Sequence, residues 1–289
     1  MKTQVDLFDH LVELSEQQKE QIERLKYWLD QTLTYEPKVG ILGKTGAGKS
    51  SLCNALFGGS VARVSNVESC TRTPQEIRIK VGSGSIKLVD FPGIAESRDR
   101  DAEYRDLYSK WLPDLDVVLW VLNAHTRDFL QDEEFYHNVV KFHLRQGKPF
   151  VIVLNQVDIV TPSREWNEKD RQPGYQQQEN IAAKQKFIAE KFKVDPVVVV
   201  PVSAMERYNL VSLVETITYA LPKEKKAPFV DKVKEENRSE RVKEDAKQGF
   251  FEALGEQIGE VVGSKPGKVI GSVIGKVVDN VVKRLFKWW

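Results

Sequence analysis

Short apolar runs alternate along the chain with longer segments in which apolar residues recur every three or four positions. Four nearly continuous apolar runs are typical of strands buried on both faces of a parallel sheet. They span residues 39–42, 116–122, 150–154 and 197–202. Residues 76–81 and 85–89 flank Gly82-Ser83-Gly84, which predicts a hairpin.

Segments with helical spacing separate these strands. They cover residues 3–33, 49–57, 96–111, 130–145, 181–192 and 210–221. Alternation of strands and helices predicts an α/β fold with a doubly wound, mostly parallel sheet and flanking N- and C-terminal helices. In such a sheet ligands bind at the carboxyl ends of the strands.

The pattern divides the chain into four parts. Residues 1–35 are expected to form an N-terminal helix, docked on the α/β domain or, alternatively, used for dimerisation. Residues 36–222 form the α/β domain, and residues 223–250, rich in charges of both signs, are expected to be a linker or a solvated helix. Residues 251–289 form a glycine-rich tail.

Composition narrows the class of protein. The 289 residues are 41% hydrophobic and 29% charged with a net charge of +1, an ordinary globular balance without global attraction to nucleic acid. Two cysteines exclude a disulfide or cysteine-metal framework. The chain has neither a signal-peptide core at its N-terminus nor a stretch near roughly 18 uncharged apolar residues. We therefore expect a cytoplasmic protein without a conventional membrane span.

The candidate chemistry begins with the spacing G-x-x-x-x-G-K-S between a predicted strand and a predicted helix, the context of a phosphate-binding P-loop. The motif comprises Gly43, Lys44, Thr45, Gly46, Ala47, Gly48, Lys49 and Ser50. Glycines turn backbone N–H groups inward, and the following helix adds the positive end of its dipole. Lys49 is placed to reach the β- and γ-phosphates, and the Ser50 hydroxyl to bind Mg²⁺.

Later strand ends carry the groups that would complete a nucleotide site. Asp90 and Gly93 form D-x-x-G, in which the Asp can hold Mg²⁺ through water and the Gly N–H can meet the γ-phosphate. Asn155 and Asp158 form N-x-x-D, and an Asp can accept both the N1–H and the N2–H₂ of guanine. Adenine lacks that donor pair, so the motif predicts guanine selection.

Two further segments fit the same site. Ser203 and Ala204 follow the last predicted strand, as expected of a base-recognition loop. Thr71 can supply a switch hydroxyl to Mg²⁺, although Thr73 competes for that role.

In this order and spacing the motifs resemble the translation-factor class of small GTPases, in the branch that holds Era, TrmE and septins. The segment from Gly43 to Phe57, with Cys70-Thr71-Arg72 downstream, is most similar to Era-like GTPases of enterobacterial prophages. The resemblance covers residues 36–222. It implies binding of GTP and GDP with Mg²⁺, and slow hydrolysis with loop switching. It also implies a contact of Ser51 toward the α-phosphate.

Three departures from the family pattern modify this expectation. Gln156 replaces a lysine that packs over the base, so we expect weaker nucleotide affinity with guanine selection retained. Ile94 stands where Ras-like enzymes place a water-orienting glutamine, so intrinsic hydrolysis should be slow. Gly46 replaces the asparagine of potassium-activated relatives, so K⁺ should stimulate little.

Slow hydrolysis suggests activation in trans. Arginines on or near the predicted switch loops could act across a homodimer of GTPase domains, or could be ordinary surface residues. They are Arg72, Arg98, Arg100 and Arg127. Two other roles stay open, an Era-like function on ribosomal RNA, by analogy alone, and a scaffold with little hydrolysis. The first is disfavoured because the chain shows no recognisable RNA-binding module.

In the tail, glycine recurs every fourth residue from Gly255 to Gly275 between pairs of β-branched residues. Lysines and the terminal pair Trp288-Trp289 favour attachment to the inner face of a membrane, or self-association. The alternative is a helix packed on the α/β domain or on the N-terminal helix. Lys276 and Asp279 argue against a lipid-exposed span, and Pro266 is expected to separate two helices.

Overall fold

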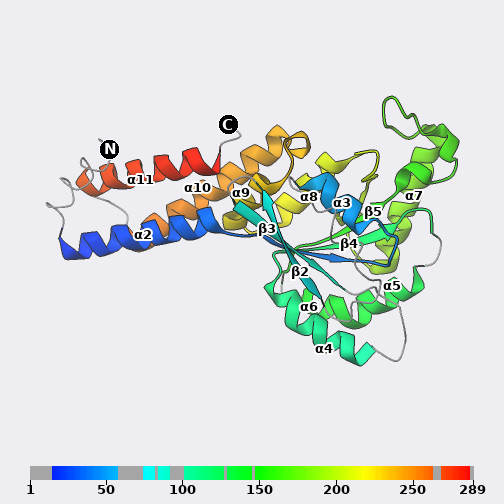
Figure 1. Cartoon of the computed structure of the whole chain (residues 1–289), viewed down its shortest axis with the longest axis horizontal. Helices are drawn as coiled ribbons and strands as arrows, with labels where there is room; N and C mark the ends of the chain where they lie inside the picture. Colours follow the sequence, from blue (N-terminus) through cyan, green and yellow to red (C-terminus); the bar gives the residue numbers. More distant parts are fainter. Residues whose placement is uncertain are drawn as a thin grey trace. The chain divides into compact units, whose positions relative to one another are not determined.

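The computed structural model describes most of the chain, in seven ranges. Those ranges are 15–57, 74–81, 84–91, 101–126, 129–144, 147–262 and 268–286. The chain forms two compact units (Figure 1). An α/β unit holds residues 36–221 and 232–242, and a helical unit holds the described parts of 1–35, 222–231 and 243–289.

The sheet of the α/β unit has the order β2-β3-β1-β4-β5-β6. The strands are β1 (Lys38–Leu42), β2 (Gln75–Val81), β3 (Gly84–Asp90), β4 (Val117–Asn123), β5 (Phe150–Asn155) and β6 (Val199–Pro201). All neighbouring pairs are parallel except β2 and β3, which form the predicted hairpin. The predicted α/β fold with a mostly parallel sheet is therefore confirmed.

Helices of this unit connect the strands. They are α3 (Lys49–Leu56), α4 (Asp101–Trp111), α5 (Leu130–Phe135), α6 (Lys141–Leu144), α7 (Tyr175–Phe192) and α8 (Leu210–Ala220). A π-helical turn, Tyr136–Val140, joins α5 to α6. Short 3₁₀ turns cover Leu112–Asp114, Val157–Ile159, Ser163–Glu165, Pro196–Val198 and Glu235–Asn237.

Helix α7 and strand β6 differ in their bounds from the sequence prediction. Helix α7 begins at Tyr175 rather than at residue 181, because its first turns are polar and hide the apolar period. Strand β6 is shorter than the run 197–202, because Pro196 starts a 3₁₀ turn whose amide at Val197 is capped by Asp195.

The core of the α/β unit is built around Trp120 on β4, which is fully buried. Its ring lies within 6.3 Å, centroid to centroid, of four aromatic rings that α5, the π-turn, β5 and α7 supply. These are Phe135, Tyr136, Phe150 and Phe192. Because they come from distant parts of the chain, this cluster fixes α5 and α7 on the sheet.

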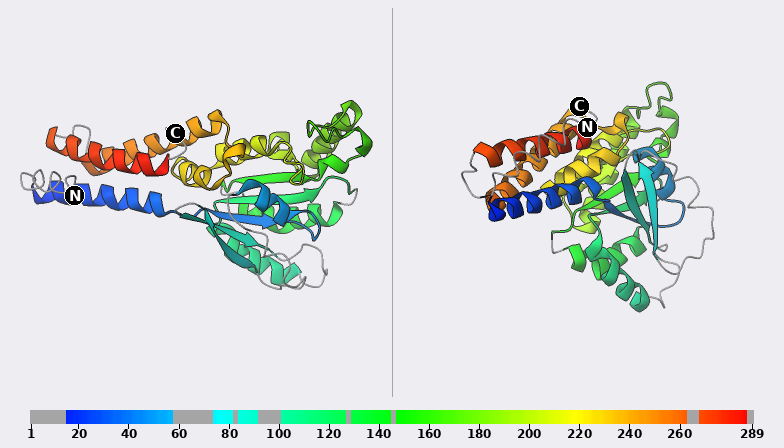
Figure 2. Two further views of the ribbon diagram at one scale, coloured as in Figure 1. Left: turned by 45° about the horizontal axis from the view of Figure 1, so that its top comes forward. Right: turned by 60° about the vertical axis from the view of Figure 1, so that its left-hand side comes forward.

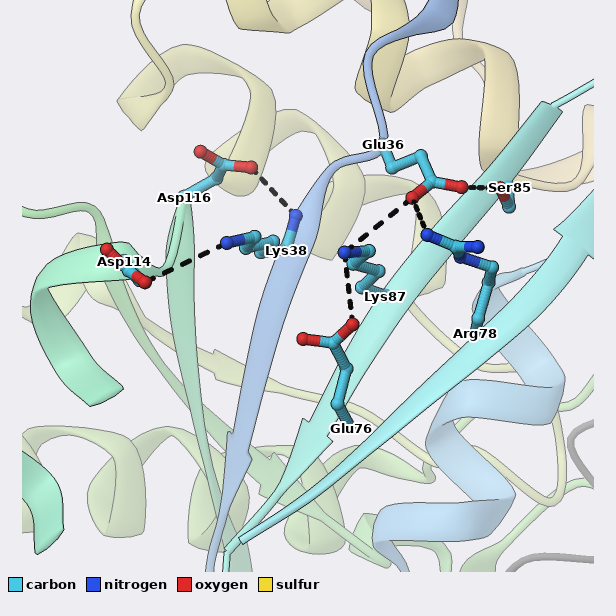
Figure 3. A network of polar contacts seen from close by, with 8 residues as sticks. All are labelled: Glu36, Lys38, Glu76, Arg78, Ser85, Lys87, Asp114 and Asp116. Atoms are coloured by element: carbon cyan, nitrogen blue, oxygen red, sulfur yellow. Dashed lines mark hydrogen bonds and ion pairs between the residues drawn. The ribbon is translucent and has the colours of Figure 1, made fainter. Parts of the chain in front are cut away.

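A charged network lies at the start of β1, at the opposite end of that strand from the P-loop (Figure 3). Glu36 pairs with Arg78 of β2 at 2.7 Å and with Lys87 of β3 at 3.7 Å, and it accepts a hydrogen bond from the Ser85 hydroxyl. That hydroxyl, followed by the two basic groups, holds the pKa of Glu36 below its usual range. The network ties the hairpin to the entrance of β1.

The helical unit contains α2 (Glu16–Thr34), α9 (Lys223–Lys232), α10 (Glu240–Val262) and α11 (Lys268–Leu285). The last residue of α9 and the first three residues of α10 belong to the α/β unit. Ser15 starts α2 with a capping box to Gln18. Helices α2 and α11 lie side by side (Figure 2). The Phe250 ring of α10 lies 6.3 Å from that of Trp28 and 5.6 Å from that of Phe286.

Residues 223–250 are not a plain linker. They form α9 and the first part of α10. Their apolar side chains are buried, whereas their charged residues, apart from the buried Lys232, are at least partly exposed. Among the buried ones, Val242, Ala246 and Phe250 recur every fourth residue. The surrounding charges conceal this helical period in the sequence.

The tail packs through its aliphatic side. Ile274, Val281 and Leu285 of α11 are buried, whereas Gly271 and Gly275 are exposed, with open space where a Cβ would lie. The alternative prediction, a helix packed on the N-terminal helix, therefore matches the described tail. Helices α10 and α11 end and begin on either side of Pro266, as expected. Among the described helices, none is both long and apolar enough to cross a membrane.

Candidate functional site

The P-loop leaves the end of β1 in a conformation that two glycines make possible. Gly43 has φ +139°, and a Cβ there would lie 2.2 Å from the Val121 carbonyl oxygen. Gly48 has φ +87°, and a Cβ there would lie 2.3 Å from Nδ2 of Asn155. Both positive φ values and both close approaches exclude a side chain. The backbone can therefore curl around a small anion.

Lys49 folds back across the loop that precedes it. Its Nζ donates to the Gly43 carbonyl at 2.9 Å and lies 3.4 Å from the Lys44 carbonyl. The backbone N–H of Ala47 also donates to the Lys44 carbonyl, at 3.2 Å. A cationic group held against a glycine-rich loop at the start of a helix suits a polyphosphate. Ser50 and Ser51 lie in the first turn of α3, beside this group.

Asn155, at the end of β5, joins three parts of the site. Its Nδ2 donates to the Ala47 carbonyl of the P-loop at 2.9 Å, and its Oδ1 accepts from the Ala204 N–H at 3.0 Å. Asn155 is fully buried, so these bonds hold the P-loop, N-x-x-D and the Ser203-Ala204 loop together. The Ser203 hydroxyl accepts from the Glu206 N–H at 3.1 Å and shapes its own loop.

Asp158 carries an unsatisfied acceptor. Its Oδ1 is buried, and no hydrogen-bond partner is present in the described parts of the chain. A buried carboxylate oxygen without a donor is unfavourable unless a ligand supplies one. The N1–H and N2–H₂ edge of guanine provides such donors, so the site fits that base. Gln156, in a left-handed conformation, donates from Nε2 to the Gly46 carbonyl at 2.9 Å.

An ion pair that was not predicted from the sequence joins the P-loop to α5. Lys44 Nζ is 2.9 Å from Asp132 Oδ2 of α5, and the Asp132 side chain is only 2% exposed. Burial raises the pKa of Asp132, against the opposing effects of Lys44 and of the Trp120 indole N–H at 3.4 Å. A cavity of about 250 Å³ borders the pair. Nothing in the sequence pattern distinguished Asp132 from a surface acid.

Part of the predicted site lies beyond the described residues. Asp90 ends β3 next to Ile41 of β1, so its backbone stands beside the P-loop, but its side chain is not described. Thr71, Gly93 and Ile94 are outside the described ranges, as are the candidate activating arginines 72, 98, 100 and 127. Their roles in catalysis and in Mg²⁺ binding stay predictions.

Comparisons with known proteins identify the family of this chain. A family described as "50S ribosome-binding GTPase" matches residues 38–156. YkfA of Escherichia coli K12 is 41% identical over 234 residues, covering 81% of this chain and 79% of YkfA. YfjP of the same organism is 39% identical with the same coverage, and both bear names of uncharacterised proteins.

GTPase Era of Aquifex aeolicus is 30% identical over 191 residues, covering 64% of this chain and 56% of Era. A crystal structure of that Era bound to GDP·AlF₄⁻ aligns with a TM-score of 0.47 at 29% identity, again covering 64% and 56%. The chain thus belongs to the Era-like P-loop GTPases, which bind GTP and GDP together with Mg²⁺.

Proposed function

We propose that this chain is a nucleotide-dependent switch that binds GTP or GDP with Mg²⁺ and hydrolyses GTP slowly on its own. The observation that carries the proposal is Asn155, whose two buried hydrogen bonds hold the phosphate-binding and base-recognition segments together. Beside it, the buried Oδ1 of Asp158, which has no hydrogen-bond partner among the described residues, offers an acceptor to guanine.

Each residue has a defined task in this proposal. Lys49 and the P-loop N–H groups bind the phosphates and stabilise the charge that develops as the γ-phosphoryl group leaves. Ser50, Thr71 and Asp90 would hold Mg²⁺, and the Gly93 N–H would meet the γ-phosphate. The metal ion supplies further neutralisation of phosphate charge.

Nucleotide affinities of the full chain test this function. We expect GDP and a non-hydrolysable GTP analogue to bind at least about 100-fold more tightly than ADP, because ADP leaves the Asp158 carboxylate without its donor pair. Lys49→Ala should abolish binding, whereas the control Lys186→Ala, an exposed lysine of α7, should leave it unchanged. Equal affinity for ADP and GDP would refute guanine recognition.

The proposal of slow GTP hydrolysis is based on Ile94, and the proposal of its activation on the arginines on or near the switch loops. An apolar side chain cannot orient the attacking water, so a second GTPase domain in a homodimer would have to supply the missing group. Specific activity should then rise with protein concentration, and replacing Na⁺ by K⁺ should change it little. A rate independent of concentration argues against dimer activation. A single-turnover assay without phosphate release would favour the scaffold alternative.

We further propose that the nucleotide state controls attachment of the tail to a membrane surface. Lys276 and Lys283 are exposed on α11 and available to anionic lipid, while its aliphatic side is buried in the helical unit. The full chain should float with anionic liposomes in one nucleotide state. A variant carrying Lys276→Glu and Lys283→Glu should not float. Absence of flotation in both states removes the membrane role and leaves self-association.

Ribosomal RNA is the alternative partner. This alternative rests on the similarity to Era. One solved structure of Era is titled as a complex with nucleotides of 16S ribosomal RNA, and that Era chain is 28% identical over 65% of this chain. Cosedimentation of the full chain with ribosomal subunits in GTP analogue, and not in GDP, would favour this role over membrane attachment.

A further inference from the structure

Gln177, the third residue of α7, has a fully buried side chain directed at the turn that follows β5. Its Nε2 donates to the Asp158 carbonyl at 2.8 Å and to the Val160 carbonyl at 2.9 Å. The Val157 carbonyl lies 3.4 Å away. One side-chain amide thus contacts three carbonyl groups of the segment that carries the base-recognising Asp158.

The orientation of this amide is fixed by its surroundings. Only its NH₂ group can face carbonyl oxygens, since the opposite orientation would bring Oε1 of Gln177 against three acceptors. Oε1 is itself buried, with no partner in the described parts of the chain. A buried acceptor without a donor is unfavourable. The side chain therefore has an unfavourable buried Oε1, while its Nε2 holds the turn that follows β5.

Neighbouring contacts also join the start of α7 to the segment that follows β5. The backbone N–H of Gln177 donates to Glu165 Oε2 at 3.1 Å, and Asn180 Nδ2 donates to the Thr161 carbonyl at 2.8 Å. Gly174 lets Glu165 approach, because a Cβ there would lie 2.6 Å from the Glu165 Cβ. The start of α7 is thereby tied to the segment that follows Asp158.

We propose that Gln177 is a positioning residue for base selection, which holds the Asp158 turn so that the carboxylate meets both donors of guanine. This inference rests on the proposed guanine recognition by Asp158. Gln177 does not contact the nucleotide in this role; it acts through the three carbonyl groups that its amide binds.

The experiment compares GDP with IDP, whose base lacks the 2-amino group and so offers Asp158 one donor fewer. Affinities of the full chain are measured for wild type and for Gln177→Met, which keeps the length and loses the N–H donors. We expect GDP affinity to fall at least about tenfold and IDP affinity much less, so that the GDP/IDP preference declines toward unity. A purely structural role would weaken both nucleotides equally.

Gln185→Met is the matched control. Gln185 lies on the same helix, and its Nε2 donates to the Pro196 carbonyl at 3.1 Å and to the Val199 carbonyl at 2.7 Å, remote in sequence from Asp158. This variant should retain the wild-type preference. Gln177→Glu, which replaces donors by acceptors at the same length, should lose more GDP affinity than Gln177→Met.

A milder variant covers the case in which Gln177→Met does not fold. Asn180→Ala removes the bond to the Thr161 carbonyl and should lower the GDP/IDP preference about two- to threefold. An unchanged preference in the folded variants, or an equal loss for both nucleotides, overturns the role of Gln177. A wild-type protein that does not prefer GDP to ADP overturns the proposed function instead.

Discussion

The ion pair between Lys44 and Asp132 predicts that its two halves differ in their effect on stability. Lys44 is 31% exposed and can turn into water when its partner is removed, whereas Asp132 is 2% exposed and cannot. Asp132→Asn therefore leaves a solvated lysine. Lys44→Met, which keeps the apolar stem, leaves a carboxylate in the interior. Among the described side chains, the partner that it keeps is the Trp120 indole, at 3.4 Å.

The magnitudes follow from the cost of a buried charge. Removing one partner of a buried pair destabilises a protein by about 3–5 kcal/mol. The carboxyl can escape by taking up a proton, which at pH 7 costs about 4 kcal/mol for a group with an ordinary pKa near 4, at about 1.36 kcal/mol per unit. We expect Lys44→Met to lower the free energy of unfolding by about 3–4 kcal/mol and Asp132→Asn by about 1 kcal/mol. The double variant should resemble Asp132→Asn.

The sign of the pH dependence follows from the raised pKa of Asp132, which burial causes. In the folded state this carboxyl takes up its proton at a higher pH than in the unfolded state. Its contribution to stability is therefore greatest below the unfolded pKa and is lost as pH rises through the folded pKa. Loss of Lys44 raises the folded pKa further. The penalty of Lys44→Met should thus shrink as pH falls from 8 to 5.5.

Urea denaturation without nucleotide, at pH 8 and pH 5.5, measures these effects in the wild type, both single variants and the double variant. Lys38→Met is the control, since the Lys38 side chain pairs with the exposed Asp114 at 3.9 Å and should change stability by less than about 1 kcal/mol. The reasoning is wrong if Asp132→Asn destabilises as much as Lys44→Met, or if the penalty of Lys44→Met does not vary with pH.

Three further variants, one of them with a matched control, test other parts of the structure. Gly48→Ala places a Cβ 2.3 Å from the Asn155 amide at a φ of +87°, so calorimetry should show at least about tenfold weaker GDP binding. Phe250→Ala should lower the free energy of unfolding by about 3–5 kcal/mol, and Phe251→Ala, at an exposed ring, by less than about 1 kcal/mol. Glu36→Gln should destabilise at neutral pH, because the lowered pKa of Glu36 contributes stability above its unfolded pKa. That loss should vanish as pH falls through the folded pKa, and a difference that persists in acid would contradict it.

Much of the fold could be predicted because its signals are local. Parallel strands buried on both faces appear as continuous apolar runs, and the helices between them as periodic segments. The P-loop and Asn155 could be predicted too, since each follows a strand at a fixed spacing. The order of the strands in the sheet leaves no comparable local signal.

Other features could not be predicted from the sequence because the residues that contact each other lie far apart along the chain. Asp132 and Gln177 are polar residues on helices, and nothing local distinguishes them from surface positions; only the folded chain brings Lys44 and the Asp158 turn to them. In residues 223–250 the charges conceal the buried period at Val242 and Phe250. In the tail, the glycine spacing indicated a packing surface, but Gly271 and Gly275 lie on the exposed side of α11.

The helical unit is assembled from both ends of the chain, with the whole α/β unit synthesised in between. On the ribosome, α2 therefore emerges long before α11, on the order of tens of seconds at about 5–20 residues per second. Through that interval Ile22, Leu25 and Leu29 lack the packing that buries them in the complete chain. Deleting the tail would remove α11 from beside α2, so a truncated protein would report on a partly uncovered α2 as much as on a missing tail.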